Sequence, residues 1–267
     1  MPWSRGWWAW NVELPRLPAD EAGIRAWLTN RESIRAELGE LLALGPNALH
    51  WGSGGMEEPG ERALAGRRLY RHELGIPGFF AALWEPGSDL RSGLGVIYQP
   101  AGRSQAHANS ELLNGWLRRG HVVVVLDAVG LNDNELLVGR SATAFNTRLV
   151  QCAVDGLLAR GDVSRVVCRG EVDDVLAWVM ALDERISEGW VVSRGGEEPS
   201  ALGKGRMEGV VPGSARIIDR LGLWAMAAPR PLRFAANVLD AQEFCLLQRV
   251  WAALGAGDRL EAQGKGA

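Results

Sequence analysis

Residues 166–186 read VVCRGEVDDVLAWVMALDERI, and this stretch decides the fold. An apolar run leads into a turn at residues 168–172, and a helical pattern follows from Asp173 to Leu182. The order predicts a buried strand, a tight turn and a helix. The residue that the turn would expose is Gly170, which has no side chain.

The flanking sequence predicts a hairpin followed by alternating strands and helices. A helical pattern covers residues 19–44, and Gly45-Pro46 ends it. Further strands are predicted over residues 67–74, 78–84, 94–98, 121–126, 163–168, 189–193 and 232–238. Further helices are predicted over residues 110–117, 142–160, 173–182, 217–226 and 242–254. This order indicates an α/β fold whose mostly parallel sheet is covered by helices on both faces, with an antiparallel edge.

The size fits one main domain. We expect a Trp-rich arm over residues 1–19, a domain over residues 20–260 and a flexible tail over residues 261–267 of the 267-residue chain. Residues 50–65 and 193–209 are rich in Gly and Glu and are expected to be loops.

Composition excludes several classes of protein. The net charge is −3, and no basic run or zinc-finger spacing indicates nucleic-acid binding. No stretch approaches the roughly 20 apolar residues that span a bilayer. No cofactor motif and no metal-ligand spacing is present. The chain as given predicts a cytoplasmic protein, although a secreted protein trimmed of its leader would have the same features.

Four segments carry a resemblance to a known family. They read LRRGHVVVVLDAVG, VGRSATAFNTRLVQCAVDGLL, ALDERI and VVPGSARIIDRLGLWAMAAPRPLRFAANVLDA, in this order. Together they resemble the α/β-hydrolase superfamily, and within it bacterial proteins similar to acetyl xylan esterases and dienelactone hydrolases. The resemblance runs from about Trp27 to Leu260.

The resemblance implies a catalytic site that this chain lacks in part. The superfamily carries its nucleophile in a Gly-x-Ser-x-Gly turn between a strand and a helix, and registering on ALDERI places Gly170 there. Asp240 matches the acid position. The family histidine should follow near the C-terminus, but no histidine comes after His121.

Pocket candidates lie after the predicted strands, where open α/β sheets bind ligands. They are Gln99, Gly102, Asp127 and Glu171. One backbone N–H from the loop at 99–104 and one from Glu171 would bind an anion or a carbonyl oxygen.

Alternatives remain open at each position. A register error would make Cys168, Glu171 or Asp173 the nucleophile. Burial would make Cys168 unreactive, and Glu171 and Asp173 also suit the first turn of a helix. Asp240 would equally cap the helix that begins near residue 242. The loop residue His107 is the one histidine that could approach the pocket.

Two functions follow. One is a hydrolase homologue that has lost the nucleophile and histidine and acts as a non-catalytic binding or scaffolding protein. Its partner would be a small-molecule or carbohydrate ligand, or a protein bound through Trp7, Trp8 and Trp10. The other is an active esterase-like hydrolase of small acyl or carbohydrate esters with a non-standard site. The family histidine is expected near the C-terminus. Reading the genomic sequence beyond Ala267 would therefore help to decide between these two functions.

Overall fold

The computed structural model describes residues 15–42, 51, 55–57, 68–73, 80–87, 90–100, 110–126, 141–170, 173–192, 211, 213–236 and 238–263. Side chains are described at all of these except residues 55–57, 68–73, 80, 110, 173 and 174. Within these ranges, no helix combines the length and the apolar character needed to cross a bilayer.

The described strands form one nine-stranded sheet in the order β1-β2-β3-β5-β4-β6-β7-β8-β9. The first three strands run antiparallel to their neighbours. From β5 onward all pairs are parallel. The strands are β1 (Gly55–Glu57), β2 (Arg68–Glu73), β3 (Phe80–Glu85), β4 (Leu94–Gln99), β5 (Val122–Leu126), β6 (Arg165–Gly170), β7 (Ile186–Val191), β8 (Leu232–Phe234) and β9 (Leu260–Ala262).

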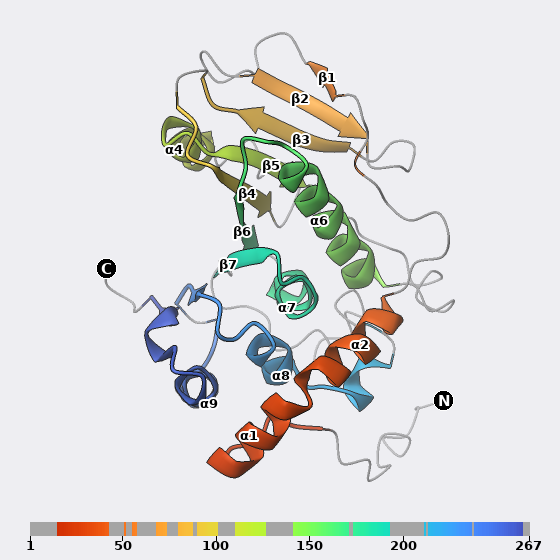
Figure 1. Ribbon diagram of the computed structural model, residues 1–267, viewed down its shortest axis with the longest axis vertical. Helices are drawn as coiled ribbons and strands as arrows, with labels where there is room; N and C mark the ends of the chain where they lie inside the picture. Colours follow the sequence, from red (N-terminus) through yellow and green to blue (C-terminus); the bar gives the residue numbers. More distant parts are fainter. Residues whose placement is uncertain are drawn as a thin grey trace, which may run out of the picture.

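Helices cover both faces of this sheet, but unequally (Figure 1). Six of the described α-helices belong to the larger apolar core: α1 (Glu21–Thr29), α2 (Arg31–Leu41), α6 (Ala142–Leu158), α7 (Asp173–Leu182), α8 (Arg220–Ala225) and α9 (Ala241–Ala253). On the opposite face α4 (Ser110–Arg118) packs over β3, β4 and β5 through Leu113, Trp116 and Leu117. Two short 3-10 helices, η2 (Ser214–Arg216) and η3 (Gly257–Arg259), complete the described elements.

Arginine side chains hold the C-terminal end of α7 in place. Arg230 donates to the carbonyl oxygens of Asp183 at 2.7 Å and Ile186 at 2.9 Å, and also to that of Met180. Arg35 donates to the carbonyl of Ala181 at 2.9 Å. The last carbonyls of a helix lack partners within the helix and carry partial negative charge, so these guanidinium groups fix the β6–α7–β7 unit.

Several predictions are confirmed. The α/β class and the hairpin of β2 and β3 are present, and α7 has the predicted bounds. Other elements shift. The helix predicted over residues 19–44 is two helices that meet at Asn30. β7 begins at Ile186 rather than Gly189, and β8 ends at Phe234 rather than near Val238.

Two short strands were missed by the sequence analysis. β1 lies inside the loop predicted over residues 50–65 and pairs with β2. β9 pairs with β8 and extends the sheet into the segment 261–267 that was expected to be a tail. Three-residue strands carry too little periodicity to be recognised in a sequence.

Candidate functional site

Gly170 is the last residue of β6, at the carboxyl edge of the sheet. It pairs with Gln99 on β4 and with Val191 on β7, and its carbonyl accepts a hydrogen bond from the N–H of Val192 at 2.9 Å. The strand predicted to end at residue 168 therefore continues through residues 169 and 170, which had been expected in the turn. The helix α7 begins at Asp173, and residues 171 and 172 lie outside the described part of the chain.

Gln99 is the last residue of β4 and pairs with Gly170, whereas the sequence analysis placed it in the loop after that strand. Its side chain is buried, and its Nε2 lies 3.4 Å from the Oδ1 of Asn146 on α6. Asn146 also donates to the carbonyl of Ala142 at 2.8 Å. Asn146 was not among the predicted site residues, although an amide on the apolar face of an amphipathic helix was a usable signal.

Four predicted site residues lie outside the described part of the chain. They are Gly102, His107, Asp127 and Glu171. The same holds for Trp7, Trp8 and Trp10 of the N-terminal arm, and for the side chain of Asp173. Their roles stay predictions.

Cys168 does not have the surroundings of a nucleophile. It lies within the ladder of β6, paired with Ile97 and Gly189, and its side chain is buried in the larger core. Burial, with a smaller contribution from Asp183, raises the pKa of its thiol to about 12. The thiolate is the reactive form of cysteine, so this thiol is inert at neutral pH, as predicted.

Asp240 caps a helix. It is exposed and precedes α9, where its Oδ1 accepts from the N–H of Glu243 at 2.8 Å. The Oε2 of Glu243 in turn accepts from the N–H of Asp240 at 3.0 Å. This reciprocal pair is a capping box, and it confirms the capping role that the sequence allowed for Asp240.

His121 lies at the opposite edge of the sheet, directly before β5. Its Nδ1 is 2.8 Å from the Oγ of Ser92, and burial, with Arg119 as a smaller cause, lowers its pKa. Of the four histidines, it is the one whose side chain the structure describes. It does not face the carboxyl edge that carries Gly170.

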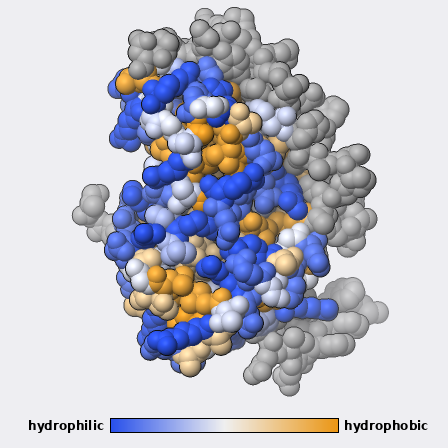
Figure 2. Space-filling model, viewed as in Figure 1, coloured by the Kyte–Doolittle hydropathy of each residue, from blue (hydrophilic) through white to orange (hydrophobic). Residues whose placement is uncertain are grey.

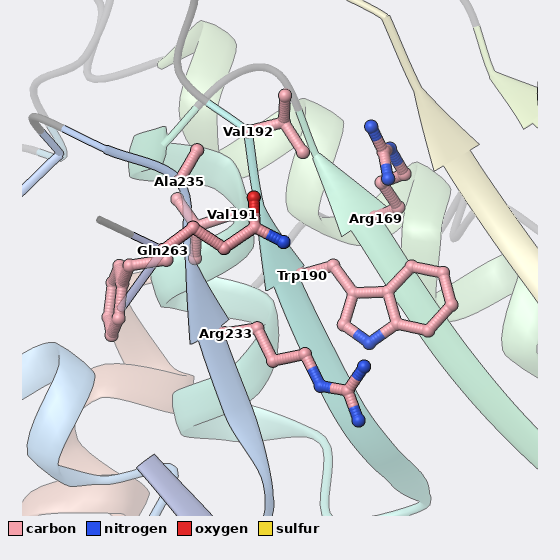
Figure 3. A pocket seen from close by; sticks show the side chains of 8 residues that line it. Arg169, Trp190, Val191, Val192, Arg233, Ala235 and Gln263 are labelled. Atoms are coloured by element: carbon pink, nitrogen blue, oxygen red, sulfur yellow. The ribbon is translucent and has the colours of Figure 1, made fainter. Parts of the chain in front are cut away.

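A cavity of about 200 Å³ opens at the carboxyl ends of β6 to β9 (Figure 3). Its described lining comprises Arg169, Trp190, Val191, Val192, Arg233, Phe234, Ala235 and Gln263. None of these was a site candidate in the sequence. They come from β6, β7 and β8 and from the segments that follow β7, β8 and β9, and no motif in the sequence links them.

The described surface offers few other binding features. On the face shown in Figure 2, hydrophilic residues predominate and the hydrophobic ones form separate patches. Leu90 and Leu254 are the large apolar side chains most exposed among the described residues. In the same ranges, no three His, Cys, Asp or Glu side chains are grouped to hold a metal ion.

Comparison with known proteins identifies the fold. The sequence matches no protein-family model and no curated protein at a significant level. A protein from Bacteroides fragilis that is assigned as an acetyl xylan esterase superposes with a TM-score of 0.72 at 12% identity, covering 95% of this chain and 78% of that one. Methylesterase BT1017 superposes with a TM-score of 0.68 at 22% identity over 92% of this chain.

A third similar structure is a CE15 glucuronoyl esterase from Teredinibacter turnerae, with a TM-score of 0.60 and 16% identity, covering 91% of this chain and 78% of that one. This chain spans only 60% of methylesterase BT1017. At such identities the likeness establishes the fold, while each activity belongs to the neighbour. The mixed sheet, its strand order and these neighbours agree: this chain has the α/β-hydrolase fold.

Proposed function

We propose that this protein is an α/β-hydrolase homologue that has lost its nucleophile and histidine, and that it binds a small-molecule or carbohydrate ligand without cleaving it. The observation that carries the proposal is Gly170 at the carboxyl end of β6, between Gln99 and Val191. A residue without a side chain provides no attacking atom at the position that the resemblance assigns to the nucleophile.

Two further observations support the loss of catalysis. The carboxylate of Asp240 is engaged in the capping box of α9, whereas a triad acid orients a histidine. The sequence has no histidine after His121. Loss of the nucleophile or the base costs a serine hydrolase about 10⁶ in rate, so the loss of both leaves no useful turnover.

The cavity at the ends of β6 to β9 supports a binding function. Ligands of open α/β sheets bind at the carboxyl ends of the strands, and this cavity is open there. The similar structures named as carbohydrate esterases favour a carbohydrate-derived ligand.

The second candidate is an active esterase-like hydrolase. The observation that favours it is that the similar solved structures are named as esterases. Its catalytic groups would come from segments that the structure does not describe, with His107 and Glu171 as the candidates.

Turnover of p-nitrophenyl acetate separates the two candidates. The non-catalytic proposal predicts a rate equal to that of buffer containing the same mass of an unrelated protein. Turnover that co-purifies with the chain and disappears in His107→Ala or Glu171→Gln would establish the esterase instead. Each variant must retain the wild-type melting temperature for this comparison.

A further inference from the structure

Strands β6 to β9 have one apolar face and one polar face. Toward α6, α7, α8 and α9 they present the apolar residues Val166, Ile186, Val191, Leu232, Phe234 and Leu260. Their other face carries Arg165, Arg169, Glu188, Trp190, Arg233 and Glu261. Parallel strands buried on both sides are apolar almost throughout. The alternation in these four strands therefore indicates a face that meets water or a polar ligand.

Glu188 organises this polar face. Only 5% of its surface is exposed. Its carboxylate accepts from Arg165 Nη2 at 3.0 Å, pairs with Arg233 Nε at 3.1 Å and accepts from Trp190 Nε1. A buried carboxylate with several donors holds those donors in fixed positions. Glu188 therefore orients both Trp190 and Arg233.

The oriented groups line the cavity. The guanidinium carbon of Arg233 lies 5.8 Å from the centre of the Trp190 ring. Figure 3 shows the guanidinium groups of Arg169 and Arg233 on either side of the indole, with Gln263 reaching toward it from the end of β9. Arg233 forms ion pairs with Glu188 at 3.1 Å and with Glu261 at 3.4 Å, both measured from its Nε.

The eight described lining residues of the cavity include two arginines and no acidic residue. Two carboxylates lie beside it: Glu188 pairs with Arg165 and Arg233, and Glu261 also pairs with Arg233. Guanidinium groups bind carboxylates through paired N–H donors, and an indole offers a flat apolar surface with positive edges.

We infer that this cavity binds a ring compound that carries a carboxylate, such as a sugar acid or an aromatic acid. Arg233 binds the carboxylate, Arg169 adds positive charge on the other side of the indole, the Trp190 indole packs against the ring, and the Gln263 amide bonds a ring substituent. A volume of about 200 Å³ lies below the roughly 300–1,000 Å³ of drug-sized sites, which fits a single ring. The inference rests on the proposed binding function and names its ligand class.

Calorimetric titration of the whole protein with matched pairs of ligands tests the inference. One pair is galacturonic acid and galactose, and the other is benzoate and benzyl alcohol, all at the same ionic strength. We expect at least one acid to bind with a dissociation constant below about 1 mM and at least tenfold more tightly than its neutral partner. Which acid binds distinguishes a sugar acid from an aromatic acid.

Two variants and a matched control locate the site. Arg233→Gln and Arg169→Gln should each weaken binding of the acid at least tenfold. Arg165→Gln should leave binding within twofold, because Arg165 pairs with the same Glu188 but does not line the cavity. Arg169→Gln keeps the test valid if Arg233→Gln fails to fold.

Three results would overturn the inference: equal binding of acid and neutral ligand, unchanged binding by both cavity variants, or no binding of any of the four ligands. Failure of the proposed function looks different, since it would appear as ester turnover by a protein that still binds the acid.

Discussion

The side chains of Asp240 and Glu243 each accept a hydrogen bond from the other residue's backbone N–H, at 2.8 and 3.0 Å. The position that the resemblance assigns to the catalytic acid therefore serves the first turn of α9. A carboxylate with this role stabilises the fold whether or not the protein is an enzyme.

Asp240→Ala should lower the free energy of unfolding by about 1 kcal/mol, the usual cost of losing a helix cap. Asp240→Asn should stay within about 0.5 kcal/mol of wild type, since asparagine caps equally well. Urea denaturation followed by circular dichroism measures both. A fully stable Asp240→Ala variant would show that this capping contributes nothing.

Glu188→Gln should lower the free energy of unfolding by about 2 kcal/mol, because a buried carboxylate loses charge-assisted bonds from its donors. Glu261→Gln is the matched control. Glu261 pairs with the same Arg233, at 3.4 Å, but its side chain is 57% exposed, so the change should stay within about 0.5 kcal/mol. Similar losses in the two variants, measured by urea denaturation, would contradict the organising role of Glu188.

Arg230→Gln should cost at least about 2 kcal/mol, because it leaves carbonyls at the end of α7 without a donor in a buried setting. Arg249→Gln removes a single exposed bond, to the carbonyl of Ala19 at 2.7 Å, and should cost less than about 1 kcal/mol. Thermal and urea unfolding compare the two. If Arg249→Gln proved the more damaging variant, the assigned role of Arg230 would be wrong.

Stability should fall as the pH rises above about 9. Burial raises the pKa of Cys152 and of Cys168 from 9.0 to about 12. Between these values the unfolded chain loses the thiol protons while the folded chain keeps them, so the free energy of unfolding decreases. Each thiol lowers the free energy of unfolding by at most about 1.4 kcal/mol per pH unit in this range.

Urea unfolding at pH 8 and at about pH 10.5 measures this loss, which should reach roughly 1–2 kcal/mol per thiol. The double variant Cys152→Ala and Cys168→Ala should lose less stability between the two pH values than wild type does. An equal loss in both proteins would mean that other groups cause the alkaline decline.

The parts of the fold with strong periodicity were predictable from sequence. α7 was predicted with its observed bounds because apolar residues fill residues 175–182 and acidic residues mark its start. The break at Asn30 was missed because both flanking helices share one helical pattern. The predicted start of β7 was three residues too late, because the polar residues Ser187 and Glu188 did not fit an apolar strand. In the structure they belong to a strand with one polar face.

The site was predictable only in part. Gly170, Gln99 and Asp240 could be placed because each follows a predicted strand. Arg169, Trp190, Arg233 and Gln263 could not, since only folding brings together the three strands β6, β7 and β8 and the residue after β9. A single arginine or tryptophan in a short strand forms no recognisable sequence pattern. The ion pairs of Glu188 depend on the register of β6 to β9, which the sequence does not reveal.

The non-catalytic function depends on the lack of a reactive side chain at the end of β6. Intact-protein mass spectrometry after treatment with a fluorophosphonate probe measures this, with an active serine esterase treated in parallel. We expect no added mass on this chain while the esterase is labelled completely. A stoichiometric adduct that maps to one serine would contradict it.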